Sequence, residues 1–526
     1  MKYALLFLLL NAYSISSLYA QSEFLDSTFG TNGVVLANHE RVGAEFVQTL
    51  QVQADGKIIL YGLDLDSGGL RVVLGRYHNN GVPDLTFGSE GFVQTFFSRK
   101  HTGDYSSQYE LGDMVLLDSG KILVAGYSGD DKQLFLARYS SNGQLDDTFG
   151  SDGITYPFDE LQLRPSDIAV QKDGSVIVCG VSKDGVIADG FLARFKPDGT
   201  PDSSFGRDGI VLSASVSQEC SLYGFISLAL DSEGRILVNG FDDYNAAVDS
   251  YKLVVAAFDS SGNIDTSFGV NGCSLKLVTT LRSISVGDIL LSGNYIVMTV
   301  GSEQEYATVR LTQGGERDQT FGINGYQVWR DRVITLPRIN AGPDGSLFLS
   351  GSIVGDGGSY DFFLGRYLAD GSIDSQFGRN GEIVIDVNKS ENRDFPLGVV
   401  SQLDGKIIQF GTSYRSVKGD LTLVRYNAQE LVSSVEGETE LFGTIETSVV
   451  GNSIDLSFTS TTRTTVDLRL YTLDGRELEQ FTYPDILPGR QSLQIDLPEE
   501  LPNGLYLLAL SVGREKVEGV KVRVER

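Results

Sequence analysis

The stretch "LDSTFGTNGVV", residues 25–35, contains a pattern that recurs along the chain and decides its fold. The pattern is Asp, any two residues, Phe, Gly, any two residues and Gly. It begins at seven positions: Asp26, Asp84, Asp146, Asp202, Asp265, Asp318 and Asp374. Successive copies are about 58 residues apart on average, which is typical of a repeat architecture.

Two further motifs occur between these copies, in the same order each time. One is a turn followed by a β-forming run: "DGKIIL" (55–60), "SGKILV" (119–124), "DGSVIV" (173–178), "EGRILV" (233–238), "SGNYIV" (292–297), "DGSLFL" (344–349) and "DGKIIQ" (404–409). The other is a short apolar run: "LGRY" (74–77), "LARY" (136–139), "LARF" (192–195), "VAAF" (255–258), "TVRL" (308–311), "LGRY" (364–367) and "LVRY" (423–426). Each motif therefore occurs seven times.

One repeat predicts four antiparallel strands. In "YGFISLALDSEGRILVNG" (223–240), two apolar runs are joined by an acidic turn that ends in Gly, which indicates a β-hairpin. A third strand, "LVVAAF", follows a polar loop, and a fourth, "CSLKLV", follows the Phe-Gly turn. Four strands in about 58 residues are typical of one blade of a β-propeller.

The two ends of the repeat region predict how a ring would close. The last repeat ends after "LVRY" without a Phe-Gly motif, and "LDSTFGTNGVV" near the N-terminus is a Phe-Gly motif without the strands that precede it elsewhere. We therefore expect the N-terminal strand to complete the seventh blade. Such closure removes the open edge of a sheet, whereas a solenoid would carry capping segments at both ends.

The motif residues have predictable structural roles. The two Gly residues allow positive φ in the turn, and the residue before the second Gly is Asn, Asp or Glu in every copy. We expect the Phe to pack between blades and the Asp to accept backbone hydrogen bonds in the turn. A buried Arg needs a partner, and the motif Asp is the candidate. These Arg residues are Arg76, Arg138, Arg194, Arg310, Arg366 and Arg425, and one copy has Ala257 instead.

The motifs "DGKII", "LARY" and "LDDTFG" with its following Gly resemble the delta-60 repeats of bacterial secreted and surface proteins. The resemblance covers about residues 22–430. It implies a β-propeller with NHL-like strand order and implies no defined activity. The predicted fold is thus all-β, with a seven-bladed β-propeller over residues 21–430 that the N-terminal strand closes.

The two termini predict an exported protein. Residues 1–20 have the pattern of a secretory signal peptide, with Lys2, the apolar run "YALLFLLL" and a small-residue end "SSLYA". No later segment reaches the ~18 apolar residues that a transmembrane helix needs. We therefore expect a secreted or cell-surface protein without a transmembrane segment.

After a linker at residues 431–445, short alternating runs over residues 446–526 predict a small β-sandwich. The blocks "LYTLDGRE" and "NGLYLL" resemble the C-terminal sorting domain of type IX secretion cargo. That resemblance implies export through the type IX machinery, with this domain as the address. The start of the domain, "TSVVGNSIDLSF", departs from the family, whose members usually carry an Asn-Pro motif there; a generic accessory sandwich is the alternative.

Charge and cysteine content narrow the possible partners. The formal net charge is −27, so a phosphate backbone would be repelled and nucleic acid is a poor partner. The three Cys residues, Cys179, Cys220 and Cys273, form no disulfide framework and allow at most one pair. Cys179 reads as a buried strand residue. We expect a monomer.

The sequence contains no motif for a particular chemistry. The three His residues, His39, His78 and His101, all lie in the first fifth of the chain, and there is no Cys/His zinc cluster or phosphate-binding loop. Calcium is possible at "DLDSGG" (64–69) and "DDYNAAVDS" (242–250), which place carboxylates in expected loops. We therefore assign no catalytic or cofactor residue and leave the metal site open.

Two classes of function stay open. The regular repeat favours a non-enzymatic binding or scaffold module for an extracellular glycan, peptide or surface protein. The alternative is an extracellular propeller enzyme, such as a calcium-dependent lactonase or a polysaccharide-degrading enzyme. An enzyme should show polar residues from several non-equivalent blades that converge at the channel mouth.

Overall fold

The chain divides into two compact units, Met1–Ser433 and Ser434–Arg526. The helical content of the described residues is one 3-10 turn, Ser213–Ser215, and none of them forms a helix long and apolar enough to cross a membrane. The computed structural model describes residues 24–37, 46–66, 69–97, 110–128, 133–158, 161–183, 188–216, 222–241, 251–279, 285–301, 306–329, 335–342, 344–354, 360–387, 393–402, 404–414, 419–427, 446–450, 453–460, 464–472, 477–487, 489–497, 504–512 and 516–524.

The described part of the first unit folds into seven antiparallel sheets of four strands each. Six sheets contain strands that are consecutive in sequence. The first sheet consists of β2(Phe46–Val52), β3(Ile58–Asp66), β4(Gly69–Tyr77) and β5(Phe92–Phe96), and the second of β6(Glu110–Leu116), β7(Ile122–Ser128), β8(Gln133–Tyr139) and β9(Ile154–Thr155). The third consists of β10(Leu163–Val170), β11(Val176–Ser182), β12(Asp189–Phe195) and β13(Ile210–Leu212), and the fourth of β14(Gly224–Leu230), β15(Ile236–Phe241), β16(Tyr251–Phe258) and β17(Cys273–Thr279). The fifth consists of β18(Ser285–Ser292), β19(Tyr295–Gly301), β20(Tyr306–Thr312) and β21(Tyr326–Trp329), and the sixth of β22(Thr335–Ala341), β23(Leu347–Val354), β24(Tyr360–Tyr367) and β25(Glu382–Ile385).

The seventh sheet joins the two ends of the repeat region. It consists of β26(Asp394–Ser401), β27(Ile407–Tyr414), β28(Gly419–Tyr426) and the N-terminal strand β1(Val34–Ala37). β1 pairs antiparallel with β28, so that Val34 lies opposite Val424 and Ala37 opposite Leu421. The predicted pairing of the N-terminal strand with the last repeat is confirmed.

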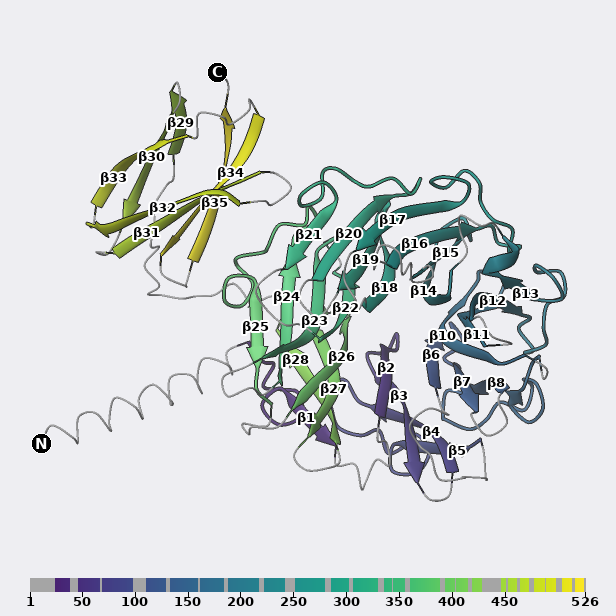
Figure 1. The fold of residues 1–526 in the computed structure, drawn as a ribbon. Helices are drawn as coiled ribbons and strands as arrows, with labels where there is room; N and C mark the ends of the chain where they lie inside the picture. The colour runs from purple at the N-terminus through teal and green to yellow at the C-terminus, as the bar shows by residue number, and fades with distance from the viewer. Residues whose placement is uncertain are drawn as a thin grey trace, which may run out of the picture. The chain divides into compact units, whose positions relative to one another are not determined.

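The sheets follow one another around a common centre (Figure 1), and the first strand of each sheet lies nearest to it. Each of these strands contacts the first strands of both neighbouring sheets, and β26 of the last sheet contacts β2 of the first. The contact between the last and first sheets is apolar, since Ile408, Phe410 and Leu423 share one buried cluster with Leu60 and Val73. The ring of sheets is therefore closed.

The Phe-Gly motif forms the same turn in all seven copies. The residue before the second Gly has a φ of 52–55° in each copy; these residues are Asn32, Glu90, Asp152, Asp208, Asn271, Asn324 and Asn380. The motif Phe side chains are at most 1% exposed. A Cβ added at Gly143, which lies in the turn of the second sheet, would approach Phe87 of the first sheet to 2.9 Å. The predicted packing of this Phe against the next sheet is confirmed there.

The strand Arg pairs with the motif Asp in six sheets, as the sequence predicts. The nitrogen–oxygen distances are 2.6–3.3 Å. In the second sheet, Arg138 Nε donates to Asp146 Oδ2 (2.6 Å), and Nη1 donates to the carbonyl of Pro197 in the third sheet (2.5 Å). The guanidinium also lies 4.6 Å from the ring centroid of Phe149. One side chain thus stabilises its own turn and the contact with the next sheet.

These pairs change the acidity of the motif carboxylates. Burial alone would raise the pKa of Asp84, but hydrogen bonds from Thr86 and the charge of Arg76 lower it to about 2. Burial opposes the shift at Asp146 as well, where hydrogen bonds from Lys121, Thr148 and Arg138 hold the pKa well below its usual range. The motif carboxylates of these two sheets are therefore charged and stabilised at neutral pH.

The fourth sheet has Ala257 at the position of the strand Arg, and an Arg at another position pairs with its motif Asp. Arg235, which follows the hairpin Gly, lies 3.5 Å from Asp265 through Nη1. Its guanidinium also lies 5.6 Å from the ring centroid of Phe268, the motif Phe of this copy. The charge partner of the motif Asp is thus kept although its place in the sequence has changed.

The described residues of the second unit form two antiparallel sheets. One has the order β29(Glu446–Val450), β30(Ser453–Ser460) and β33(Gly489–Asp496). The other has the order β32(Glu477–Ile486), β31(Thr464–Thr472), β34(Gly504–Val512) and β35(Lys516–Val524). Ile454, Leu456 and Ile495 of the first sheet share a buried cluster with Leu468 and Leu508 of the second.

Candidate functional site

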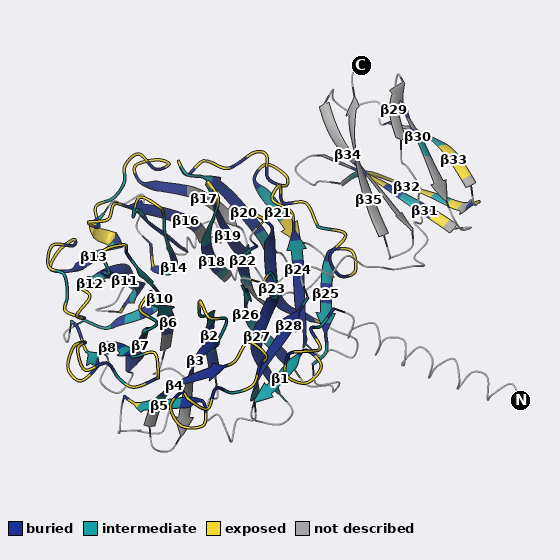
Figure 2. Cartoon of the chain, turned by 180° about the vertical axis from the view of Figure 1, so that it is seen from behind, coloured by how far each residue is buried: buried dark blue, intermediate teal, exposed yellow. Residues whose placement is uncertain are grey.

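A cavity of about 420 Å³ lies where the first strands of the seven sheets meet. Residues of β2, β6, β10, β14, β18, β22 and β26 all line it. Figure 2 shows these strands around the centre of the ring, with exposed residues concentrated in the connecting turns. A polar residue on any of these strands can therefore face the same space.

An irregular register recurs where each first strand borders the cavity. In all seven sheets the pairing of the first strand with the second shifts by one residue at this point. Such bulges redirect side chains and are common beside functional sites. At or next to the bulge, and lining the cavity, lie Thr49, Asp113, Asp167, Ser227, Asp288, Arg338 and Gly398. One position of the repeat thus presents side chains of very different chemistry.

Asp167, on β10, is held by donors from its own and the next sheet. Ser227 Oγ and the Leu228 backbone N–H both donate to its Oδ2 (2.8 Å each), and the Ile168 N–H donates to Oδ1 (2.7 Å). Burial and then the charge of Asp113 raise the pKa of Asp167 to about 7. This carboxyl therefore changes its charge close to neutral pH.

Asp113, on β6, has a similar environment. The Met114 backbone N–H donates to its Oδ1 (2.6 Å), and a hydrogen bond from Thr49 also stabilises the charged form. Burial is the largest influence and, with the charge of Asp288, raises its pKa to about 6. Two carboxyls that titrate near pH 7 in one cavity have the acidity that general acid–base catalysis uses.

The third carboxylate, Asp288 on β18, forms an ion pair with Arg338 on β22. The charge of Asp288 raises the pKa of Arg338 above its usual value, so this guanidinium stays charged. The pair connects the fifth and sixth sheets across the cavity wall. It also balances one of the three negative charges in the cavity.

The seventh sheet gives the cavity an apolar wall. Its lining residues are Leu397, Gly398, Val399, Val400 and Phe410. Gly398 stands where the other sheets have polar side chains, and a Cβ there would approach Phe410 to 2.4 Å. Among the described lining residues, the first strand of the seventh sheet thus contributes no polar side chain, although apolar residues of other sheets also line the cavity.

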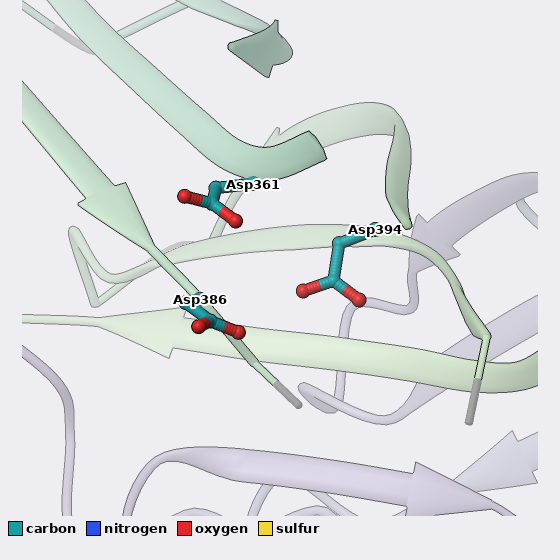
Figure 3. A group of neighbouring side chains, drawn as sticks. All are labelled: Asp361, Asp386 and Asp394. Atoms are coloured by element: carbon teal, nitrogen blue, oxygen red, sulfur yellow. The ribbon is translucent and has the colours of Figure 1, made fainter. Parts of the chain in front are cut away.

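A second acidic group lies between the sixth and seventh sheets. Asp361 on β24, Asp386 just after β25 and Asp394 at the start of β26 direct their carboxylates toward one another (Figure 3). One oxygen of each lies within 4.8 Å of the others. Burial and the charges of Asp386 and Asp361 raise the pKa of Asp394 to about 6. Three such oxygens are ligands that could hold a divalent cation.

Among the described residues, those that the sequence singled out do not line this cavity. His78 lies in a turn and approaches Asp84, with Nε2 3.7 Å from Oδ1, while His39 and His101 lie outside the described residues. Cys179 is a buried, free cysteine on β11, as predicted, and Cys273 is disulfide-bonded. Of the suggested calcium loops, 242–250 lies outside the described residues. The expected loop at 64–69 is wrong in extent, because β3 and β4 pair as far as Asp66 and Gly69.

The repeat motifs did not indicate the cavity residues, although the sequence contains a signal for them. Six of them stand seven residues before the Gly of the hairpin motif. Asp288 stands five residues before Gly293, in a copy whose hairpin is shorter. The signal is the variation at this position among otherwise similar repeats. The acidic group of Asp361, Asp386 and Asp394 has no such periodic signal.

Comparison with known proteins supports the fold. A family model described as "Domain of unknown function (DUF5122) beta-propeller" matches residues 53–87, 118–149, 171–205 and 342–377. Each match begins at the loop of a hairpin and ends at or near a motif Phe. No curated protein sequence matches the chain.

Several solved structures are similar at low identity. A Dyadobacter fermentans protein of unknown function is 12% identical, with 61% of this chain and 96% of that one covered and a TM-score of 0.37. A Mycobacterium tuberculosis puromycin-hydrolysing peptidase is 10% identical (80% and 59% covered, TM-score 0.44), and Drosophila Plexin A in complex with Semaphorin 1b is 9% identical (75% and 86%, TM-score 0.38). With its four-stranded sheets and the four family matches, the chain is a β-propeller protein.

Proposed function

We propose that the chain is an exported, non-enzymatic binding protein: a seven-bladed propeller of the delta-60 type that binds its ligand in the central cavity. The ligand would be an extracellular glycan, a peptide or part of a surface protein. The proposal assigns no cofactor, and a divalent cation at Asp361, Asp386 and Asp394 would be an addition to it.

The observation that carries this proposal is the variety of side chains at one repeat position. A ring with only a structural role would be most stable with apolar or neutral residues there, because buried carboxylates without a charge partner are costly. Asp113 and Asp167 form no ion pair among the described residues, and burial raises the pKa values of both. Groups retained against stability in a cavity are characteristic of functional sites.

An array of extracellular glycans and peptides, probed with the full mature chain, tests the proposal. Leu397→Trp should fill part of the cavity and abolish binding, whereas Leu85→Trp, on a side chain that is 68% exposed, should leave binding unchanged. Equal binding by both variants would place the ligand on another surface and contradict the proposal.

A polysaccharide-degrading enzyme is the second candidate, because one observation favours it. Asp113 and Asp167 come from different sheets and titrate near neutral pH, and glycoside hydrolysis uses a pair of carboxyl groups. The two candidates differ in what happens to a glycan that binds. An enzyme would shorten it, and Asp167→Asn would abolish cleavage but retain binding; a binding module would release it unchanged.

We also propose that residues 446–526 are a β-sandwich that acts as the type IX sorting domain. The "LYTLDGRE" block begins in β31, and the "NGLYLL" block continues into β34, its neighbour in the same sheet. Deletion of residues 434–526 in the native host should leave the protein in the periplasm, as measured by cell fractionation. Normal levels of the truncated protein in the medium or on the cell surface would refute the assignment.

A further inference from the structure

The charges in the central cavity do not balance. Among its described lining residues, Asp113, Asp167 and Asp288 are acidic and Arg338 is basic. Arg338 forms its ion pair with Asp288. Within the part of the chain that the structure describes, no ion pair is formed by Asp113 or Asp167. The charge of Arg338 also acts on Asp113 and Asp167, but this one guanidinium faces three carboxylates, so the described lining of the cavity has a net negative charge.

The protein orients these two carboxylates but neutralises them only in part, through the charge of Arg338. Among the described residues, their hydrogen-bond donors are the hydroxyls of Thr49 and Ser227 and backbone N–H groups, all of them uncharged. Each carboxylate has room for further donors, because two oxygens together accept about four hydrogen bonds. A positively charged donor that enters the cavity would relieve their mutual repulsion.

The spacing of the cavity carboxylates disfavours a bare metal ion as this donor. Oxygens of Asp361, Asp386 and Asp394 lie within 4.8 Å of one another, as ligands of one ion must. Among the described residues, the cavity carboxylates do not form a group of three at that spacing. An organic cation, whose N–H bonds extend in several directions, can bridge a wider arrangement.

The apolar residues of the seventh sheet indicate what kind of molecule carries the positive charge. The half-buried Leu397 and Val400 are apolar lining residues on this side, and the cavity volume of about 420 Å³ is in the range of sites for small ligands. A ligand with a charged end and an apolar body can satisfy both walls at once. A wholly polar cation would leave these apolar residues without a partner.

We propose that the central cavity binds a primary ammonium group on an apolar body, with the N–H donors on Asp113 and Asp167 and the body against the seventh sheet. The proposal rests on the central cavity being the ligand site. A free amine and a lysine side chain within an apolar peptide share this chemistry.

Calorimetric titration of the full mature chain tests the proposal with hexylamine, hexanol and hexanoate, which share one apolar body. Hexylamine should bind at pH 8, and the alcohol and the acid should bind at least about tenfold more weakly, the effect of losing one charge-assisted hydrogen bond. Titration with an apolar lysine-containing peptide and with free hexylamine distinguishes the two sources. Hexylamine affinity should fall between pH 8 and pH 5 as the carboxylates become protonated.

Asp113→Asn and Asp167→Asn should each weaken hexylamine binding at least about tenfold. Asp147→Asn, on an exposed motif residue, should leave it unchanged. Thermal melts establish that each variant is folded, and either variant alone is a sufficient test. Binding that is insensitive to both cavity variants, or equal for hexylamine and hexanol, would overturn the proposal.

The array experiment separates this proposal from the one on which it rests. A ligand that Leu397→Trp excludes, together with no binding of any amine, would retain the cavity as the site and overturn only the ammonium assignment. Array binding that Leu397→Trp does not affect would overturn both. Displacement of the array ligand by excess hexylamine would support both.

Discussion

The carboxylates of the motif turns and those of the central cavity belong to the same repeats but lie in opposite environments. Asp84 and Asp146 lie beside Arg side chains, which help to lower their pKa values. Asp113 and Asp167 lie beside other carboxylates, and burial raises their pKa values to about 6 and 7. The turn position is acidic in all seven repeats, whereas the cavity position is acidic in three.

This difference distinguishes residues that stabilise the fold from residues that are available to contact a ligand. A feature that every repeat needs, such as the paired turn Asp, appears in every copy because each sheet faces the same packing problem. A ligand is not seven-fold symmetric, so residues that contact it differ from repeat to repeat.

Deletion of residues 24–37 should have the largest effect. It removes β1, which pairs with β28, and Asp26, which lies 2.7 Å from Arg425 Nη2. The exposed edge of β28 should then cause aggregation. Size-exclusion chromatography and the fluorescence of Trp329, the chain's single tryptophan, report the result. A monomeric product with an unchanged unfolding transition would contradict the role of this strand in closure.

Arg310→Ala should be the most harmful of the Arg substitutions. Arg310 and Asp318 form a buried ion pair at 2.6 Å, with side chains 9% and 8% exposed. The second sheet has a further cation, Lys121, at a hairpin position that is occupied here by the uncharged Tyr295. Breaking such a pair costs about 3–5 kcal/mol of unfolding free energy. Urea unfolding followed by Trp329 fluorescence measures it. A loss below about 0.5 kcal/mol would be the value of an exposed pair and would oppose this account.

Arg138→Ala should cost less, roughly 1.5–3 kcal/mol, the value of hydrogen bonds to a charged group. Asp146 keeps a cation in this variant, because Lys121 Nζ lies 2.7 Å from its Oδ2. The same urea experiment compares the two variants. A larger loss for Arg138→Ala than for Arg310→Ala would show that the second cation does not compensate.

Deletion of residues 434–526 should have the smallest effect on the ring of sheets. The two units have separate apolar clusters, and Trp329 belongs to the first unit. The midpoint of its fluorescence transition in urea should stay the same. A clear shift to lower urea concentration would mean that the second unit stabilises the first.

The fold could be predicted from the sequence because its determinants are periodic. Motif spacing predicted the strands, the split repeat predicted the β1–β28 pair, and the need of a buried Arg for a partner predicted the Arg–Asp pairs. The partner of Asp265 could not be predicted this way, since Arg235 reaches it from the hairpin and not from the usual strand position.

The cavity could not be predicted because its residues are far apart in sequence and share no motif. Asp113, Asp167 and Asp288 are brought together only by ring closure and by the bulges that direct them inward. Asp361 and Asp394 likewise meet only where two sheets pack. Alignment of the repeats identifies positions that vary, but only the closed ring shows that they face one cavity.

The most direct test compares Asp146→Asn with Asp167→Asn in urea unfolding at pH 8, followed by Trp329 fluorescence. Asp146 has a lowered pKa, so its charge stabilises the fold at this pH, and its loss should cost about 3–5 kcal/mol. Asp167 has a raised pKa, so its contribution to stability falls as pH rises from about 4 to 7. Asp167→Asn should therefore stabilise the protein at pH 8, and less at pH 5. Destabilisation of similar size by both substitutions would contradict the distinction between structural and ligand-site carboxylates.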